Sequence, residues 1–171
     1  MRSVATLVLV PTLGLAAGPL GAPAQTLHGF EAGVASVMGE ARLAQAGYHG
    51  TFHALRSLGI EYAVALAPQF LVHGVLLTGQ DLDVGVGIGV GGPLILTARA
   101  GGSVLFAAST GGAAAAPGYN AGVGVLVRLS PRAALRLEFI SRRFPAEYDD
   151  IRVSSVTLGF VILGAAPPSA R

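Results

Sequence analysis

The alternation of hydrophobic and polar positions is clearest in the stretch DLDVGVGIGVGG, residues 81–92. Every second residue from Leu82 to Val90 is aliphatic, and the positions between them run from Asp83 through a series of glycines. A period of two is that of a β-strand, in which successive side chains point to opposite faces. The stretch therefore predicts a strand with one apolar face and one face that carries almost no side chains.

The same period recurs along most of the chain after residue 25, interrupted by turn-forming residues. The pattern predicts about eight strands, at 27–38, 56–66, 69–78, 81–91, 94–107, 119–129, 133–144 and 150–163. Two of these, 69–78 and 94–107, are apolar at both parities, so their register stays open. An even number of strands of this length is typical of a closed antiparallel barrel.

The connections between the predicted strands alternate in length. The short ones are 67–68, 92–93 and 130–132, and the longer ones are 39–55, 108–118 and 145–149. Outer-membrane barrels have short periplasmic turns and longer loops at the outer rim. We therefore predict that the loops 39–55 and 108–118 form the exposed contact surface.

A strand pattern of this kind fits two classes of barrel. In a soluble barrel the apolar face points inward, whereas in a transmembrane barrel it contacts lipid. The composition favours the second class, because 52% of the residues are hydrophobic, 12% are charged and the mean hydropathy is +0.64. The interior of about eight strands is narrow, and glycines fit it. We predict an all-β fold, a closed antiparallel up-and-down transmembrane β-barrel.

Two other architectures remain as alternatives. One is a soluble periplasmic β-barrel that binds an apolar ligand. The other is a helical membrane protein that uses residues 62–79 as a hairpin despite Pro68.

The first 24 residues have the features of an export signal. Arg2 precedes an apolar segment, and Ala22-Pro23-Ala24 has the small-x-small pattern that signal peptidase cleaves. The apolar run is short for a membrane anchor, and Pro11 interrupts it. The sequence thus predicts a signal peptide at 1–24, a barrel at 25–163 and a short disordered tail at 164–171.

Several kinds of chemistry find little support in the sequence. Cysteine is absent, the net charge is only +2, and no basic run is interleaved with aromatics, so we expect no disulfide and no nucleic-acid binding. Gly87, Gly89 and Gly92 match a dinucleotide-binding spacing, but a second strand follows where that motif requires a helix. His49 and His53 would lie about 13 Å apart on a strand, too far to share one ion. We expect no metal and no cofactor.

Charged residues gather on the parity that is predicted to face the interior. They are Glu31, Glu61, Asp83, Arg99, Arg128, Arg136, Glu138 and Arg142. Because buried charges without partners are costly, we predict an ion-pair network that bridges the barrel from wall to wall. Glu31 and Glu61 are expected near the level of three of the arginines. A network that only fills the barrel is one interpretation, and a gate for small solutes is the other.

Two arginines have the parity predicted to face lipid at the outer ends of neighbouring strands. They are Arg143 and Arg152, and Arg56 is a candidate third member. Guanidinium groups at this height pair well with lipopolysaccharide phosphates, although rim arginines that extend to water are the alternative. Four aromatic residues are predicted at the same rim, where rings with a polar edge are favoured: Tyr48, Tyr119, Phe144 and Tyr148.

The export signal, the hairpins and the final segment SPRAALRLEFISRRFPAEYDDIRVSSVTLGFVIL resemble the small outer-membrane β-barrel proteins of Gram-negative bacteria, the OmpA/OmpX-like porin-family group. The resemblance covers the whole chain after residue 24. It implies an exported monomer in the cell outer membrane, with membrane lipid and lipopolysaccharide as its partners. Such proteins usually end on an aromatic residue, whereas here Phe160 is followed by a tail that ends in GAAPPSAR.

Some barrels of this type are enzymes that modify lipids, and they use His and Ser on the seventh strand. Ser141 is present here, but Phe139 stands where the motif has His, and a serine hydroxyl without a base is a weak nucleophile. We therefore expect no enzyme activity. The predicted role is structural or in surface interaction, with passage of small solutes and a lipid-modifying enzyme as the alternatives.

Overall fold

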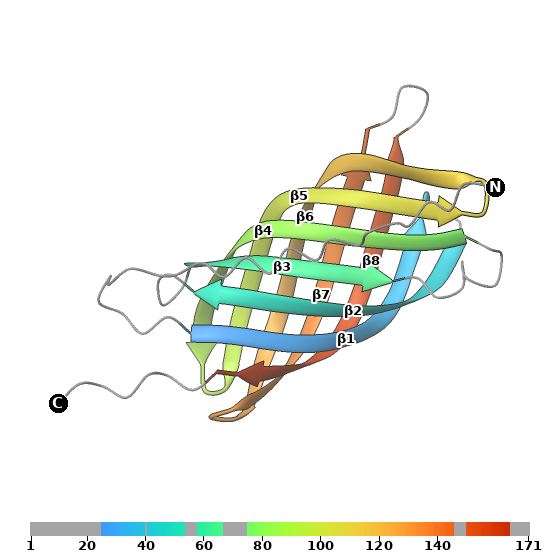
Figure 1. The fold of residues 1–171 in the computed structure, drawn as a ribbon. Helices are drawn as coiled ribbons and strands as arrows, with labels where there is room; N and C mark the ends of the chain where they lie inside the picture. The colour runs from blue at the N-terminus through green and yellow to red at the C-terminus, as the bar shows by residue number, and fades with distance from the viewer. Residues whose placement is uncertain (1–24, 40, 54–57, 67–74, 146–149, 165–171) are drawn as a thin grey trace.

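The computed structural model describes residues 25–39, 41–53, 58–66, 75–145 and 150–164, and eight strands form a closed antiparallel barrel (Figure 1). The strands are β1 (Gln25–Val37), β2 (Ala41–His53), β3 (Leu58–Leu66), β4 (Val75–Gly91), β5 (Leu94–Ser109), β6 (Gly112–Ser130), β7 (Ala133–Phe144) and β8 (Ile151–Leu163). Each strand pairs with the next, and β1 closes the barrel against β8. The predicted closed up-and-down barrel is confirmed. Within the described ranges, no helix is long and apolar enough to cross a membrane.

The barrel has two rims. The terminal rim is the end at which β1 begins and β8 ends, and its connections are 54–57, 92–93 and 131–132. The far rim carries the connections 38–40, 67–74, 110–111 and 145–150. The predicted signal peptide at 1–24 and most of the predicted tail lie outside the described residues.

The apolar parity faces outward, as the sequence predicts. In β4, Val84, Val86 and Ile88 expose 56%, 41% and 61% of their surface, and the glycines between them face the interior. Large apolar side chains are exposed in the same way on seven of the eight strands. An outward apolar surface with a polar interior is the arrangement that a lipid environment requires. The inward-facing apolar arrangement of a soluble barrel is therefore ruled out.

The segment predicted as the loop 39–55 is the strand β2. It pairs with β1 from Ala41 to His53 and with β3 from Ala46 to His53. The strand was not predicted because its two faces differ little in hydrophobicity. Its segment AQAGYHG consists of alanine, glycine, glutamine, tyrosine and histidine. The backbone hydrogen bonds from strands on both sides, and not the side-chain contrast, hold it in the barrel.

The described part of the strand predicted at 69–78, residues 75–78, and the strand predicted at 81–91 belong to one strand, β4. Residues 69–74 lie outside the described residues. β4 runs without interruption through Gly79 and Gln80, the two residues that separate the predicted strands. These residues pair with β3 on one side and β5 on the other. The predicted number of strands still agrees with the structure. β2 was not predicted, but β4 was predicted as two strands, so the total stays at eight.

The predicted contact loops are therefore wrong. Residues 38–40 and 110–111 are the actual connections in those regions, and the rest of 39–55 and 108–118 belongs almost entirely to β2, β5 and β6. The longer connections at the far rim are 67–74 and 145–150.

Three strands extend past their neighbours at the far rim. The β6–β7 register begins at Tyr119, and the end of β7 still lies against Gly118, so residues 112–117 have β5 on one side and no described strand on the other. Residues 75–77 of β4 extend beyond Thr78, the last residue that pairs with β3. We call residues 75–77, 105–109 and 112–118 the projecting sheet. It contains no charged residue.

The aromatic residues do not form the predicted ring at the outer rim. Phe144 points inward and is 1% exposed, and Tyr48 lies nearer the middle of β2, where it contacts Phe30 and His28. Tyr119 alone lies on the outer face near the far rim, with 52% of its surface exposed. Tyr148 lies outside the described residues.

Candidate functional site in the barrel interior

The interior contains a central network of charged side chains. Its members are Glu61, Asp83, Arg99, Arg136 and Glu138, from β3, β4, β5 and β7. The Arg99 guanidinium lies 2.9 Å from Glu61 and Asp83 and 2.8 Å from Glu138. Arg136 binds the same two glutamates, 2.9 Å from Glu61 and in contact with Glu138. Strands far apart in sequence are thereby joined across the lumen.

A second ion pair lies closer to the far rim. Arg142 donates to both carboxylate oxygens of Asp81, at 2.7–3.1 Å, and to the Ser155 hydroxyl at 3.0 Å. Asp81 is absent from the network predicted from the sequence, although it begins the strand predicted at 81–91. Its parity, the same as that of Asp83, was the signal that would have placed it inside.

Neutral donors join the two groups into one chain of hydrogen bonds. Asn120 donates to Asp83 at 2.7 Å and to the Ser103 hydroxyl at 2.9 Å, and Ser103 donates to Asp81 at 2.7 Å. These donors matter because the described interior holds five carboxylates and three fully buried arginines. Hydroxyl and amide groups therefore stabilise carboxylates that the arginines alone do not neutralise.

Glu31 does not join the arginines as predicted. Its carboxylate accepts a hydrogen bond from Thr157 at 3.1 Å and lies 3.8 Å from His49 Nδ1. The His49 ring is 1% exposed and packs over the backbone of Gly29 so closely that a side chain there would overlap it. The narrow lumen thus places a bulky ring on one strand opposite a glycine on its neighbour.

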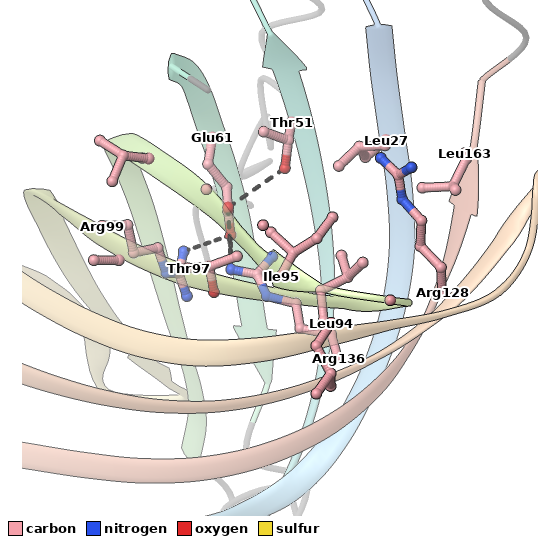
Figure 2. Close-up of a pocket in the computed structure, with 17 residues that line it drawn as sticks. Leu27, Thr51, Glu61, Leu94, Ile95, Thr97, Arg99, Arg128, Arg136 and Leu163 are labelled. Carbon is pink, nitrogen blue, oxygen red and sulfur yellow. Dashed lines mark hydrogen bonds and ion pairs between the residues drawn. The ribbon is translucent and has the colours of Figure 1, made fainter. Parts of the chain in front are cut away.

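Arg128 also departs from the prediction. It is exposed near the terminal rim, and the described residues form no ion pair with it. Arg128 instead lines a cavity of about 310 Å³, which Glu61, Arg99 and Arg136 border as well (Figure 2). Leu27, Ile95, Leu126 and Leu163 line the same cavity. We call this space the terminal cavity.

Apolar side chains close the lumen toward the far rim. The far plug consists of Leu43, Leu77, Leu105, Phe144 and Val153. Only a small cavity of about 40 Å³ remains among them. The plug and the central network therefore block the lumen at two successive levels.

The predicted lipid-facing arginines are placed at the far rim. Arg143 and Arg152 are direct neighbours across the β7–β8 pairing, and Tyr119 pairs with Arg143 on the other side. Both arginines have the outward parity of their strands. Arg56 lies outside the described residues.

The residues considered for dinucleotide binding, lipid hydrolysis and metal binding lie on regular strands. Gly87 and Gly89 lie in β4 and face the terminal cavity, and no helix follows them. Ser141 faces outward opposite Ser154. No group of three or more His, Asp or Glu side chains arranged to hold a metal occurs among the described residues.

Comparison with known proteins gives matches at the level of structure. No family model and no curated protein matches the chain. Neisserial surface protein A aligns with a TM-score of 0.63 and 11% identity, over 82% of this chain and 96% of that one. OprG from Pseudomonas aeruginosa aligns with a TM-score of 0.61 and 11% identity, over 85% and 97%.

Ail, the attachment invasion locus protein of Yersinia pestis, aligns with a TM-score of 0.57 and 11% identity, over 85% of this chain and 100% of that one. At such identities the likeness concerns the fold. Together with the outward apolar surface and the charged interior, these matches lead to one conclusion. The chain has the fold of the small eight-stranded β-barrels of the bacterial outer membrane.

Proposed function

We propose that this chain is a lumen-closed barrel of the bacterial outer membrane whose projecting sheet binds an extended segment of a partner protein at the cell surface. The observation that carries the proposal is the edge of β6 over residues 112–117, which has no described strand beside it. The unpaired N–H and C=O groups of such an edge accept a further strand. This edge consists of Gly112, four alanines and Pro117, and it lacks the charged side chains that block pairing on many edge strands. Pro117 has no N–H to donate, so the added strand is proposed to pair with residues 112–116.

The lengths of the connections support an orientation with the far rim outward. The connections 67–74 and 145–150 at the far rim are the longest, and outer-membrane barrels carry their longer loops outside the cell. The terminal rim then faces the periplasm. This orientation displays the projecting sheet above the outer surface of the membrane.

The closed interior favours this role over transport. The far plug and the central network each cross the lumen, and eight strands leave little space beyond what side chains fill. We propose no catalytic role either, because Ser141 faces outward and His49 lies inside the lumen, so the two groups do not meet.

Lipopolysaccharide is the proposed lipid partner of the far rim. Arg143 and Arg152 lie directly opposite each other on the outer face, and like charges in that position destabilise a strand pair. A phosphate group between the two guanidinium groups would remove this repulsion and accept hydrogen bonds from both. Ail is named an attachment protein, which supports a surface role for this fold. Ail has also been solved in complex with a heparin analogue, but a polyanion of this kind does not suit the uncharged projecting sheet of the present chain.

The orientation is tested by labelling single cysteines, since the natural chain has none. Ala114→Cys lies in the projecting sheet and Ser130→Cys lies at the terminal rim, and both positions are exposed. We expect a membrane-impermeant maleimide to label Ala114→Cys on intact cells and Ser130→Cys only after lysis. The opposite pattern would contradict the proposed orientation.

The surface role is tested by charging the edge. Cells that display the wild-type chain are expected to adhere to a surface coated with casein, an extended polypeptide, and not to one coated with heparin. The double variant Ala113→Lys/Ala115→Lys should lose this adhesion at equal surface display, because charged edge residues oppose strand addition. The control is Ser130→Lys, which adds a lysine at an exposed position of the other rim. Equal adhesion of the edge variant and the wild type would overturn the proposal.

A further inference from the structure

The terminal cavity lies at the opposite end of the molecule from the proposed surface contact. It has a volume of about 310 Å³, and Leu27, Arg128 and Leu163 line it at the terminal rim (Figure 2). The buried ion pairs of Glu61 with Arg99 and Arg136 close it on the inside. The volume falls at the lower end of the range for small-molecule sites, which is roughly 300–1,000 Å³.

Glycines on β4 create this space. Gly85, Gly87 and Gly89 face the cavity, and an added Cβ at Gly89 would meet no atom within 4 Å. An eight-stranded barrel is narrow enough for side chains to fill it, and around the far plug they leave a cavity of only about 40 Å³. The alternation of valine and glycine that first marks β4 as a strand thus has a second consequence, an unfilled chamber beside one wall.

The cavity wall combines an aliphatic surface with a free cation. Leu126 and Leu163 belong to a buried hydrophobic cluster, against which Leu27 and Ile95 pack, and all four side chains line the cavity. Arg128 is exposed near the mouth, and none of the described residues forms an ion pair with it. The Glu61 carboxylate, in contrast, is already bound by Arg99, Arg136 and Thr51.

We infer that the terminal cavity binds a small carboxylate with a short hydrocarbon tail. The carboxylate accepts hydrogen bonds from the Arg128 guanidinium, whose planar fork of donors matches the two oxygens. The tail lies against the aliphatic side chains of β1, β5, β6 and β8. This binding site faces the periplasm and goes beyond the surface role proposed above.

The test is calorimetric titration of octanoate into the full chain held in phosphatidylcholine nanodiscs. We expect saturable binding with one site per barrel, and no saturable heat from empty nanodiscs. Arg128→Gln should weaken binding about tenfold or more, the loss expected for a charge-assisted hydrogen bond. Gly89→Leu should abolish binding by filling the cavity. Uncharged 1-octanol should bind at least tenfold more weakly than octanoate.

Two matched variants control for charge and bulk. Arg132→Gln removes an exposed arginine from the same rim but outside the cavity, and Gly102→Leu adds the same side chain at an open position on the outer face. Both should bind octanoate like the wild type. If Gly89→Leu fails to fold, Arg128→Gln still tests the inference, because replacing an exposed side chain should not prevent folding. Octanoate heat equal to that of empty nanodiscs, or an unchanged affinity in Arg128→Gln, would overturn the inference.

Discussion

At the scale of single residues, Glu61 holds the most demanding position. It is 4% exposed, and it binds two arginines that also share Glu138. The free energy lost when these charged groups leave water offsets most of the attraction between them. The network as a whole therefore adds little to the free energy of unfolding. The loss of one member is different, because it leaves a buried charge without its partner.

Charge reversal at Glu61 provides the corresponding prediction. Glu61→Lys places a third cation beside Arg99 and Arg136, and we expect a loss of about 3–5 kcal/mol in the free energy of unfolding. Glu61→Gln should lose less, since Glu138 still binds both arginines. The measurement is urea unfolding of the protein in detergent. An unchanged midpoint for Glu61→Lys would show that the network does not support the barrel.

At the scale of elements, the register of the β7–β8 pair places two arginines side by side on the outer face. Arg143 and Arg152 are separated in sequence by the connection between the strands, yet they are direct neighbours in the sheet. Their strands also carry Glu138 and Arg142 toward the lumen, because successive side chains alternate between faces. This hairpin therefore contributes side chains to the interior network and carries the two arginines proposed to bind lipopolysaccharide.

The lipopolysaccharide contact proposed for this hairpin leads to a prediction for nanodiscs. Lipopolysaccharide in place of phosphatidylcholine should stabilise the wild type against thermal unfolding, by about 1 kcal/mol for each rim arginine. The variant Arg143→Gln/Arg152→Gln should lose this gain, whereas Arg132→Gln at the terminal rim should keep it. Thermal unfolding in the two lipids measures the difference. The same gain in all three proteins would argue against phosphate binding at Arg143 and Arg152.

At the scale of the whole molecule, the interior is divided into three levels. The terminal cavity lies at one end, the hydrogen-bonded network occupies the middle, and the far plug closes the other end. The outer surface is apolar along most of the barrel, and the projecting sheet extends past the far rim. Each level has a different chemistry, although all are built from the same alternating strands.

This division predicts that the barrel does not conduct ions. In planar lipid bilayers, the wild type should give no current steps. Removing bulk from the far plug, by Leu105→Ala/Phe144→Ala, should also give none, because the central network closes the lumen independently. Current steps in the wild type would contradict a closed lumen, and steps in the plug variant alone would show that the network level is permeable.

The interior site was predicted only in part. Parity placed Glu61, Asp83, Arg99, Arg136, Glu138 and Arg142 inside, and all six are buried there. Parity alone does not give height along the lumen or the partner of each side chain. Glu31 therefore meets His49 and Thr157, and Arg128 reaches the mouth of the cavity, although both share the parity of the network.

On the strands with clear alternation, the sequence by itself determined which side chains face lipid and which face the interior, because alternation along a strand is a local property of the backbone. It did not determine β2 or the continuity of β4, since those depend on hydrogen bonds to neighbouring strands. Tertiary structure also decided the ion-pair partners, the projecting sheet and the terminal cavity. These features arise from register and strand length around a closed barrel, where residues far apart in sequence are brought to the same height.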